Sequence, residues 1–467
     1  MTRISWRAPL LGAALLGAAA CGDKLTVPDY NRPTVEGVAG SASGTALLAA
    51  GMLIQDRNNT FGYIRDVSVF GREGYYYYPT DARFVSHYLR GQTVSGVAQL
   101  DPTGFANGNW AAWYRNLKNG ENLIATADAQ ASLSAPQKAA VKGFARTFQA
   151  LALYRVAVTR DSIGAPVEVP SDVSQPAPFV SRDAVWERVS ALLEQAKADL
   201  AGGGASFPFA LNSGFAGFDT PATFLKFNRA LAARVFANRG SLGCAACYGQ
   251  ALTALGESFI RNATSRADLD VGVYHIYSTA NGDALNGMNN SADPNLLAHA
   301  VTVTTAQKNA LGVTDDRVTR KIAKLATPRG APGSGNGIPA EYFFTVYATT
   351  TTPVAIIRNE ELLLIRAEAN LQTGKTTEAL ADINMVRTVS GGLSPLTSLG
   401  SDPIGTLLYE RQMSLLLEGH RWNDMRRFKR LAQLPLDLSN HFVARVMPIP
   451  KDECDARLPS QRPAVGC

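Results

Sequence analysis

Apolar side chains recur at helical spacing along much of the chain, and the segments that carry them follow one another in pairs. In residues 137–158, the apolar positions fall on one side of a helix and polar residues on the other. A second helix is expected to begin at Ser181 and to end before the glycines at 202–204. Two further pairs have the same layout, at 223–238 with 248–259 and at 358–373 with 376–388.

These pairs predict a mostly α-helical fold built from helical hairpins. Alanines are frequent on the apolar faces and let neighbouring helices approach closely. Recurrent hairpins of this kind resemble tetratricopeptide units, although no regular repeat of about 34 residues is present. We therefore expect a scaffold of degenerate tetratricopeptide-like helical pairs.

The stretch 262–347 has a different pattern, because it is rich in Asn, Gly, Thr and Pro and lacks helical periodicity. Short β-like runs occur at 271–277 and 341–347. The stretch is too long for a simple connection between helices. We predict a loop-rich subdomain with short β segments, laid over the helical scaffold.

The N-terminus has the pattern of an export signal. Arg3 and Arg7 precede an apolar run of about 13 residues, which is shorter than the roughly 20 needed to cross a bilayer. Three alanines then lead directly to Cys21, as is typical of a bacterial lipoprotein signal. We predict a signal peptide at 1–20, lipidation of Cys21 and a tether at 21–40; an ordinary secretory signal is the alternative.

The charge and cysteine content of the chain disfavour several classes of function. The formal net charge is +6 and no block of like charge stands out, so nucleic acid is not an implied partner. After Cys21, four cysteines remain, and in an exported protein they can form disulfides, with Cys244 and Cys247 as one pair and Cys454 and Cys467 as the other. A zinc site or a redox CxxC motif is disfavoured, because zinc-like spacing and a βαβ context are both absent. No metal or cofactor is predicted.

A charged and apolar motif lies near the C-terminus, within residues 409–427. Its distinctive members are Glu410, Arg411, Glu418, Gly419, Arg421, Trp422 and Asp424. The motif resembles a diagnostic stretch of the SusD/RagB family of nutrient-uptake outer-membrane lipoproteins. Further matches occur in the expected order at Cys21, 164–167, 358–370, 384–387 and 447–450. The resemblance covers essentially the whole chain after the leader, so residues 41–467 are expected to form one SusD-like domain.

The resemblance implies a lipid-anchored, surface-exposed protein of the cell outer membrane. Such a protein captures an oligosaccharide or another nutrient and delivers it to a SusC-like TonB-dependent transporter, without cleaving it. The charged residues of the motif alternate with an apolar face, so we expect them to orient helices in the fold and not to act in catalysis.

Sugar recognition requires flat apolar faces for the rings and planar polar groups for the hydroxyls. The segment 72–83 supplies both, and smaller clusters occur near residues 110 and 275. The candidate ligand-binding residues are Arg72, Glu73, Tyr75, Tyr76, Tyr77, Tyr78, Asp81, Asn109, Trp110, Tyr274 and Asn281. Four consecutive tyrosines cannot all face inward, and whether they bind sugar or pack beneath a loop stays open. Trp110 and Trp113 at i, i+3 also suit one buried helical face.

Two alternatives to glycan capture remain. A secreted helical glycan-degrading enzyme needs two carboxylates flanking the scissile bond, and Glu73 and Asp81 are the loop carboxylates near aromatic residues. The sequence has no HExxH, GxSxG or P-loop motif to support an enzyme. The other alternative is a scaffold that binds a protein or peptide, as tetratricopeptide grooves do.

Overall fold

The fold is described from a computed structural model of the chain. The structure describes residues 37, 41, 43–94, 97–104, 108–172, 174–289, 294–331, 338–463 and 466–467. The predicted signal peptide, Cys21 and nearly all of the expected tether lie outside these residues.

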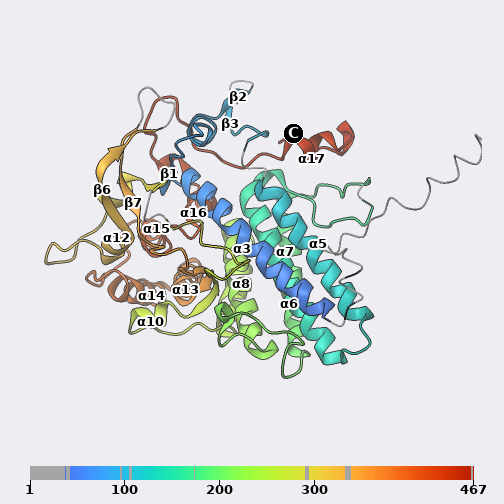
Figure 1. Cartoon of the computed structure of the whole chain (residues 1–467). Helices are drawn as coiled ribbons and strands as arrows, with labels where there is room; N and C mark the ends of the chain where they lie inside the picture. Colours follow the sequence, from blue (N-terminus) through green and yellow to red (C-terminus); the bar gives the residue numbers. More distant parts are fainter. Residues whose placement is uncertain are drawn as a thin grey trace, which may run out of the picture.

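Long helices dominate the first half of the described chain, and each packs against the next long helix (Figure 1). They are α3 (Gly44–Phe70), α5 (Gly108–Ala129), α6 (Ala135–Arg160), α7 (Arg182–Ala201), α8 (Pro221–Ser241) and α9 (Cys247–Gly256). Local signals fix where several of them begin. The side chain of Ser134 caps α6 in a capping box, and the hydroxyl of Ser181 accepts a hydrogen bond from the Ala184 amide at the start of α7.

A second group of helices comes from the C-terminal third: α13 (Asn359–Gln372), α14 (Thr376–Val389), α15 (Pro403–Ser414) and α16 (Arg421–Arg427). Helix α13 packs against α8, α9, α14 and α15, so it joins the two groups. The apolar faces of α13, α14 and α15 enclose a separate small core that includes Leu363, Ile383 and Leu407. The larger core lies among the helices from α3 to α9 and the neighbouring strands.

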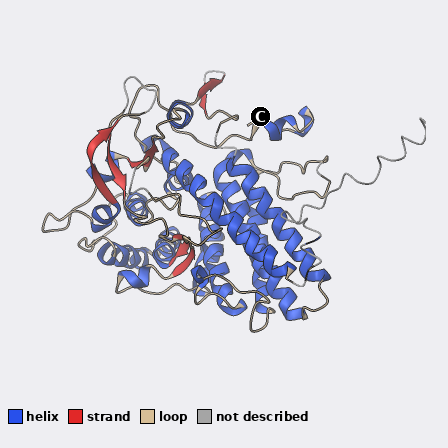
Figure 2. Cartoon of the chain, in the orientation of Figure 1, coloured by secondary structure: helices blue, strands red, loops and turns tan. Residues whose placement is uncertain are grey.

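Strands β6 (Ile322–Arg329) and β7 (Ala340–Phe344) lie at one side of the molecule, away from the long helices (Figure 1 and Figure 2). A four-stranded antiparallel sheet has the order β1-β5-β7-β6. Its strands are β1 (Gly74–Tyr76), β5 (Leu296–Ala298), β6 (Ile322–Arg329) and β7 (Ala340–Phe344). Two smaller antiparallel pairs consist of β2 (Gln92–Val94) with β3 (Val97–Gln99) and of β4 (Gly272–His275) with β8 (Val354–Arg358).

Short elements complete the described chain. The α-helical ones are α4 (Arg83–Val85), α10 (Arg266–Leu269), α11 (Ala300–Thr304), α12 (Asp316–Lys321) and α17 (Lys451–Asp455). The π- and 3-10-helical turns are η1 (Ser86–Arg90), η3 (Asp161–Ile163), η4 (Ser213–Phe215), η5 (Leu431–Gln433) and η6 (Pro459–Gln461).

The predicted fold class is confirmed. All six helices of the predicted pairs are present, with ends that agree to within about three residues. The stretch 262–347 does contain short strands, at the two predicted places and also at β5 and β6. One edge strand of the four-stranded sheet, β1, comes from outside this stretch, from the segment that follows α3. It pairs with β5, which lies far away in the chain.

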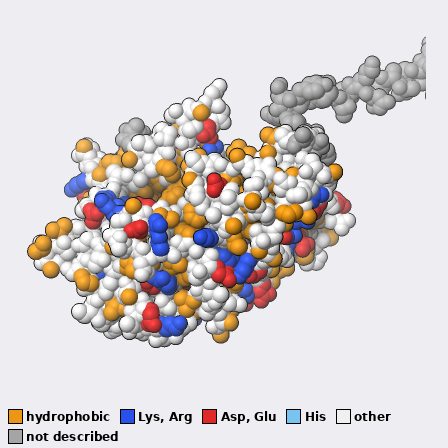
Figure 3. All heavy atoms as spheres, turned by 90° about the horizontal axis from the view of Figure 1, so that it is seen from below, with side chains coloured by type: hydrophobic (Ala, Val, Ile, Leu, Met, Phe, Trp, Pro, Cys, Tyr) orange, Lys and Arg blue, Asp and Glu red, His pale blue; other side chains and the backbone are white. Residues whose placement is uncertain are grey.

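Two disulfide bonds are present, joining Cys244 to Cys247 and Cys454 to Cys467. The first lies at the turn between α8 and α9, and the second holds the C-terminal residue against α17. In the part of the chain that the structure describes, no helix combines the length and the apolar character needed to cross a membrane. On the face drawn in Figure 3, basic and acidic side chains are interspersed.

Candidate functional site

Arg72, the first of the candidate ligand residues, lies inside the protein. It follows the C-terminus of α3 in a left-handed backbone conformation, with a φ of 55°, and its side chain is fully buried. Its guanidinium donates hydrogen bonds to the carbonyl oxygens of Val69, Pro435 and Phe442. Arg72 therefore ties the end of α3 to a C-terminal segment and is not available to a ligand at the surface.

Glu73 is also buried. Its carboxylate accepts hydrogen bonds from the Ser68 hydroxyl at 2.8 Å and from the Leu417 amide at 3.3 Å. Burial disfavours the charged form and raises the pKa of Glu73 to about 7. The side chain links α3 to the C-terminal motif, and no substrate in solvent can reach it.

The four tyrosines at 75–78 divide into an inward and an outward pair, because successive residues of a strand face opposite sides. Tyr75 and Tyr77 are buried and stack on each other with ring centroids 5.2 Å apart. Tyr76 and Tyr78 lie on the other side, with centroids 5.9 Å apart and ring planes only 5° from parallel. Tyr78 is 41% exposed.

Side chains from two helices extend this outward pair. We call the group formed by Phe61, Arg65, Tyr76, Tyr78 and Phe84 the aromatic surface. Phe84 of α4 contacts Tyr76 edge-on at 4.7 Å, and Phe61 of α3 contacts it at 6.2 Å. The guanidinium of Arg65 lies 4.6 to 5.5 Å from the ring centres of Phe84, Tyr76 and Phe61.

Polar groups neighbour the residues of the aromatic surface along the chain. Beyond Tyr78, Asp81 accepts hydrogen bonds from the side chain of Arg83, which lowers the pKa of the Asp81 carboxyl. One helical turn before Phe61, Arg57 forms a 2.7 Å ion pair with Asp283 and lies over the ring of Tyr277. That ion pair holds the loop at 278–284 against α3, and Asn281 is exposed in this loop.

The remaining candidates lie elsewhere. Asn109 is buried, and its amide donates a 2.6 Å hydrogen bond to Asp66. Trp110 is buried as well and forms part of the wall of a different cavity, beside α5. Trp113, the neighbour at i+3, is fully buried in the core.

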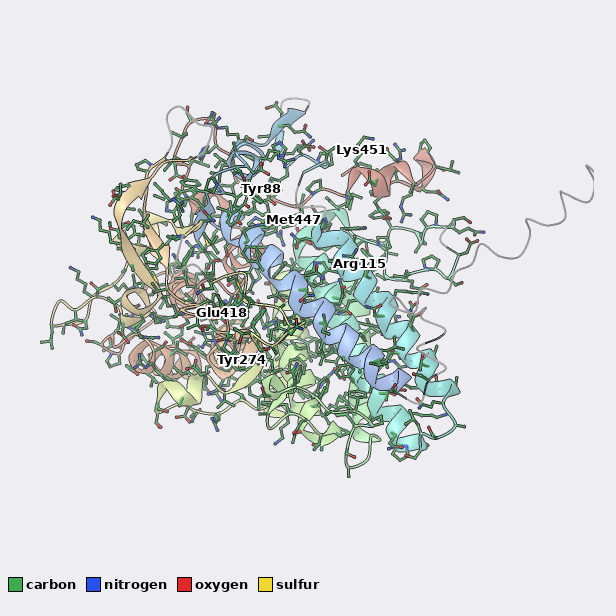
Figure 4. The ribbon with its side chains drawn as sticks, viewed as in Figure 1. Tyr88, Arg115, Tyr274, Glu418, Met447 and Lys451 are labelled. Atoms are coloured by element: carbon green, nitrogen blue, oxygen red, sulfur yellow. A yellow bond between two sulfur atoms is a disulfide. The ribbon has the colours of Figure 1, made fainter. Side chains whose placement is uncertain are left out.

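Tyr274 lines a separate polar cavity of about 400 Å³ together with Lys321, Arg358 and Glu418. Burial lowers the pKa of Lys321 to about 8, and its ammonium donates a 3.0 Å hydrogen bond to the Met413 carbonyl oxygen. Figure 4 shows Tyr274 and Glu418 near each other and away from Tyr88, which packs against Phe84. The structure therefore does not bring Tyr274 to the aromatic surface.

The charged residues of the C-terminal motif form internal ion pairs. Arg411 contacts Asp424 at 2.7 Å, and Arg427 joins Asp424 to Glu368 of α13. Although burial alone would raise it, the charges of Arg411 and Arg427 lower the pKa of Asp424 to about 2. Glu418 pairs with Arg358 at 2.7 Å. These contacts connect α13, α15 and α16 within the fold.

The uncharged residues of the motif also pack internally. Trp422 is fully buried, and its indole N–H donates a 2.7 Å hydrogen bond to the Ala444 carbonyl oxygen. Gly419 has a φ of 82°, and a Cβ there would lie only 2.9 Å from the ring of Tyr63. Burial lowers the pKa of Arg421, while the nearby charge of Glu73 opposes that change. None of these side chains contributes to the aromatic surface.

Sequence reasoning missed three of the five residues of the aromatic surface: Phe61, Arg65 and Phe84. A weak signal for two of them exists, since Arg57, Phe61 and Arg65 are spaced four residues apart and share one face of α3. Among the residues that the structure describes, no group of three or more His, Cys, Asp or Glu side chains could hold a metal ion.

The fold and the site define a class: an α-helical scaffold of packed helical pairs that carries a small β-sheet with the aromatic surface beside it. The model of the SusD family matches residues 344–453, which include the C-terminal motif. This match to the SusD family model, over the segment that carries the motif, confirms the resemblance found in the sequence.

Solved structures share the fold over nearly the whole chain. A SusD superfamily protein from Bacteroides vulgatus has a TM-score of 0.67 at 14% identity, covering 90% of this chain and 98% of its own. Surface glycan-binding protein A from Bacteroides uniformis has a TM-score of 0.67 at 15% identity, covering 90% and 99%. Surface glycan-binding protein A from Bacteroides thetaiotaomicron, solved in complex with laminarihexaose, has a TM-score of 0.64 at 14% identity, covering 89% and 97%. No curated protein is similar enough in sequence to count as a relative.

Proposed function

We propose that this protein captures an oligosaccharide at the cell surface and that the aromatic surface contacts its sugar rings. The observation that carries the proposal is the parallel arrangement of Tyr76 and Tyr78, with Tyr78 41% exposed. A sugar ring presents C–H groups on its faces, and these pack well against an aromatic ring. Of these two parallel rings, with centroids 5.9 Å apart, that of Tyr78 is well exposed and offers such a face at the surface.

The flanking groups suit the hydroxyls of a glycan. The Asp81–Arg83 pair follows Tyr78 in the chain, and Arg57 of the Arg57–Asp283 pair lies one helical turn from Phe61. The Arg83 side chain is 60% exposed, so its guanidinium can reach a hydroxyl group of a bound sugar. This combination of flat apolar faces and planar polar groups supports carbohydrate over an apolar ligand at this surface.

We propose binding without cleavage. A glycosidase needs two accessible carboxyl groups on either side of the scissile bond. Of the two carboxylates considered from the sequence, Glu73 is buried inside the protein, and Asp81 is held by Arg83 with a lowered pKa. A carboxyl group with a lowered pKa is a poor general acid at neutral pH.

We further propose that the protein is anchored in the outer membrane by lipid at Cys21 and passes its ligand to a SusC-like TonB-dependent transporter. The match to the SusD family model and the leader sequence support this role. Tethering the domain beside its transporter replaces bulk diffusion by a high effective concentration, so the affinity for the glycan can be modest. Replacing Cys21 by Ser should release the protein from the membrane fraction, and affinity purification of the anchored form should recover a transporter barrel.

Calorimetry of the soluble body, beginning after Cys21, tests the glycan-binding proposal. Laminari-oligosaccharides head the panel, because one structural neighbour was solved with laminarihexaose and another is a laminarin-binding SusD-like protein. A ligand should bind saturably and stay intact on chromatography. Tyr78→Ala should weaken binding roughly tenfold or more, the loss expected of an aromatic anchor residue.

Tyr274→Ala serves as the matched control, because Tyr274 lies in the separate polar cavity and its loss should leave glycan affinity unchanged. Equal affinity of Tyr78→Ala and the unchanged protein for a bound glycan would refute the role of the aromatic surface. Cleavage products in the mixture would move the protein to the enzyme class.

A further inference from the structure

The cavity beside α5 that Trp110 helps to line lies apart from the aromatic surface, and we call it the second cavity. It has a volume of about 440 Å³ and is lined by α5, by the facing loop (residues 166–172 and 174–177) and by α17 with Arg457 after it. None of the residues of the aromatic surface lines it. Figure 4 shows Arg115 on α5 and Lys451 at the start of α17, which mark two of the three elements around it. Its size falls within the range of pockets that bind small molecules.

Side-chain hydrogen bonds connect the three walls of this cavity to one another. The Tyr114 hydroxyl of α5 donates to the Pro166 carbonyl oxygen at 2.7 Å. The Trp110 indole N–H of α5 donates to Glu453 of α17 at 3.3 Å. Arg457, just after α17, donates to the Ala177 carbonyl oxygen at 2.7 Å. Each wall is therefore fixed to the other two, and the cavity is formed before any ligand arrives.

The interior of the cavity is mainly apolar, with Trp110, Val169, Pro170 and Pro176 among its lining residues. Three of its polar lining side chains, those of Tyr114, Glu453 and Arg457, are used in hydrogen bonds within and between the walls. A sugar ring packed against the apolar interior would leave the hydroxyl groups on that side without partners, which is costly. An apolar side chain has no hydroxyl groups, so its burial here leaves no hydrogen bond unmade.

Charges of opposite sign stand on opposite walls. Arg115 is exposed on α5, and Glu168 is exposed on the facing loop. Neither has a hydrogen-bond or ion-pair partner among the described residues, whereas Lys118 pairs with Glu121 at 3.0 Å. An apolar cavity with an unpaired cation and an unpaired anion on facing walls complements a molecule that has an apolar body and both charges.

We propose that this cavity binds a short apolar peptide with free termini. The peptide carboxylate pairs with Arg115, its ammonium group pairs with Glu168, and its apolar side chains occupy the interior beside Trp110. This site goes beyond glycan capture and does not depend on it, because the two sites share no residue.

Calorimetry with the soluble body tests the proposal, using dileucine and phenylalanyl-leucine together with N-acetylated and C-amidated forms of each. Free peptides should bind saturably, and capping either end should weaken binding about tenfold, the loss of one charged contact of about 1.4 kcal/mol. Arg115→Ala and Glu168→Gln should each have an effect of similar size. Lys308→Ala, which removes an exposed cation far along the chain, is the charge-matched control and should have no effect.

A steric variant separates this site from the aromatic surface. Ala111 is exposed on α5 and lines the cavity, so Ala111→Phe should fill it and abolish peptide binding while glycan binding stays unchanged. Tyr78→Ala should show the opposite pattern. Absence of peptide binding, equal binding of capped and free peptides, or peptide binding that survives Ala111→Phe would each overturn the proposal. Glycan binding that is lost in Ala111→Phe and retained in Tyr78→Ala would assign the cavity to sugar instead.

Discussion

Arg317 of α12 and Glu410 of α15 form an ion pair of 2.6 Å in which neither side chain has any exposure to solvent. Glu410 also contacts Arg387 of α14 at 2.9 Å, while Arg317 contacts Asp315 at 2.6 Å. One carboxylate of the C-terminal motif thus connects α14 and α15 to α12, the helix that leads into β6. The motif acts here through buried charges that lie against opposite charges.

Glu410→Ala should destabilise the protein by about 3–5 kcal/mol, because Arg317 and Arg387 would lose a partner inside the fold. Denaturant unfolding monitored by circular dichroism measures the change in unfolding free energy. Glu378→Ala removes an exposed carboxylate from the neighbouring helix α14 and should cost less than about 1 kcal/mol. Similar small losses for both variants would show that the buried cluster does not stabilise the fold.

Glu73 should make stability depend on pH. Its folded-state pKa of about 7 lies above its usual value of 4.5, so between these values the folded state holds a proton that the unfolded state has released. Stability from this group is therefore present below about pH 4.5 and is lost as the pH rises to about 7, by roughly 3 kcal/mol in total. The nearby charges of Arg421 and Glu418 act on this carboxyl in opposite directions.

Glu73→Gln removes this titration while keeping a side chain of the same shape. Relative to the unchanged protein, the variant should gain stability as the pH rises from 5 to 8, in unfolding experiments at each pH. Glu378→Gln should show no such trend, since its side chain is exposed. If the difference in unfolding free energy between the Glu73 variant and the unchanged protein stays constant over this range, Glu73 is ionised in the folded state.

The helical pairs could be predicted because their signals are local. For α7, the apolar period, the capping residue Ser181 and the terminal glycines lie within one short segment, and the structure has the helix at Arg182–Ala201. The four-stranded sheet could not be predicted in the same way. Its strand β1 pairs Gly74 with Ala298, and no local pattern indicates which of many distant short segments will be the partner.

The candidate site was predictable only in part for a similar reason. The run of tyrosines marked the segment, but which pair faces outward depends on how β1 is placed in the sheet. Phe61, Arg65 and Phe84 join Tyr76 only through the packing of α3 and α4 beside the strand. Arg72 and Glu73 have the chemistry of ligand contacts, yet the fold uses both to connect α3 to C-terminal segments.

Phe84 should control glycan affinity without touching the glycan. It is 7% exposed and contacts Tyr76 edge-on, with Tyr78 within 6.5 Å, so it fixes the angle of both rings. Phe84→Leu keeps the site apolar and removes the ring contacts, so affinity should fall by roughly three- to tenfold, as expected for about 1 kcal/mol. Calorimetry with a ligand that depends on Tyr78 measures the change. Unchanged affinity would show that Tyr76 and Tyr78 hold their positions without Phe84.

The disulfide between Cys454 and Cys467 should stabilise the wall that α17 contributes to the second cavity. It closes a loop with a sequence separation of 13, and cross-links of about that length contribute roughly 3 kcal/mol. A variant with both cysteines replaced by Ser should show faster amide hydrogen exchange in residues 451–463 and weaker peptide binding, because Glu453 and Arg457 are held less firmly. Replacing Cys244 and Cys247 instead is the matched control, since that bond lies between α8 and α9 and should leave exchange in 451–463 unchanged. Exchange that is equally slow in both variants would show that the bonds from Trp110 and Arg457 suffice to hold α17 in place.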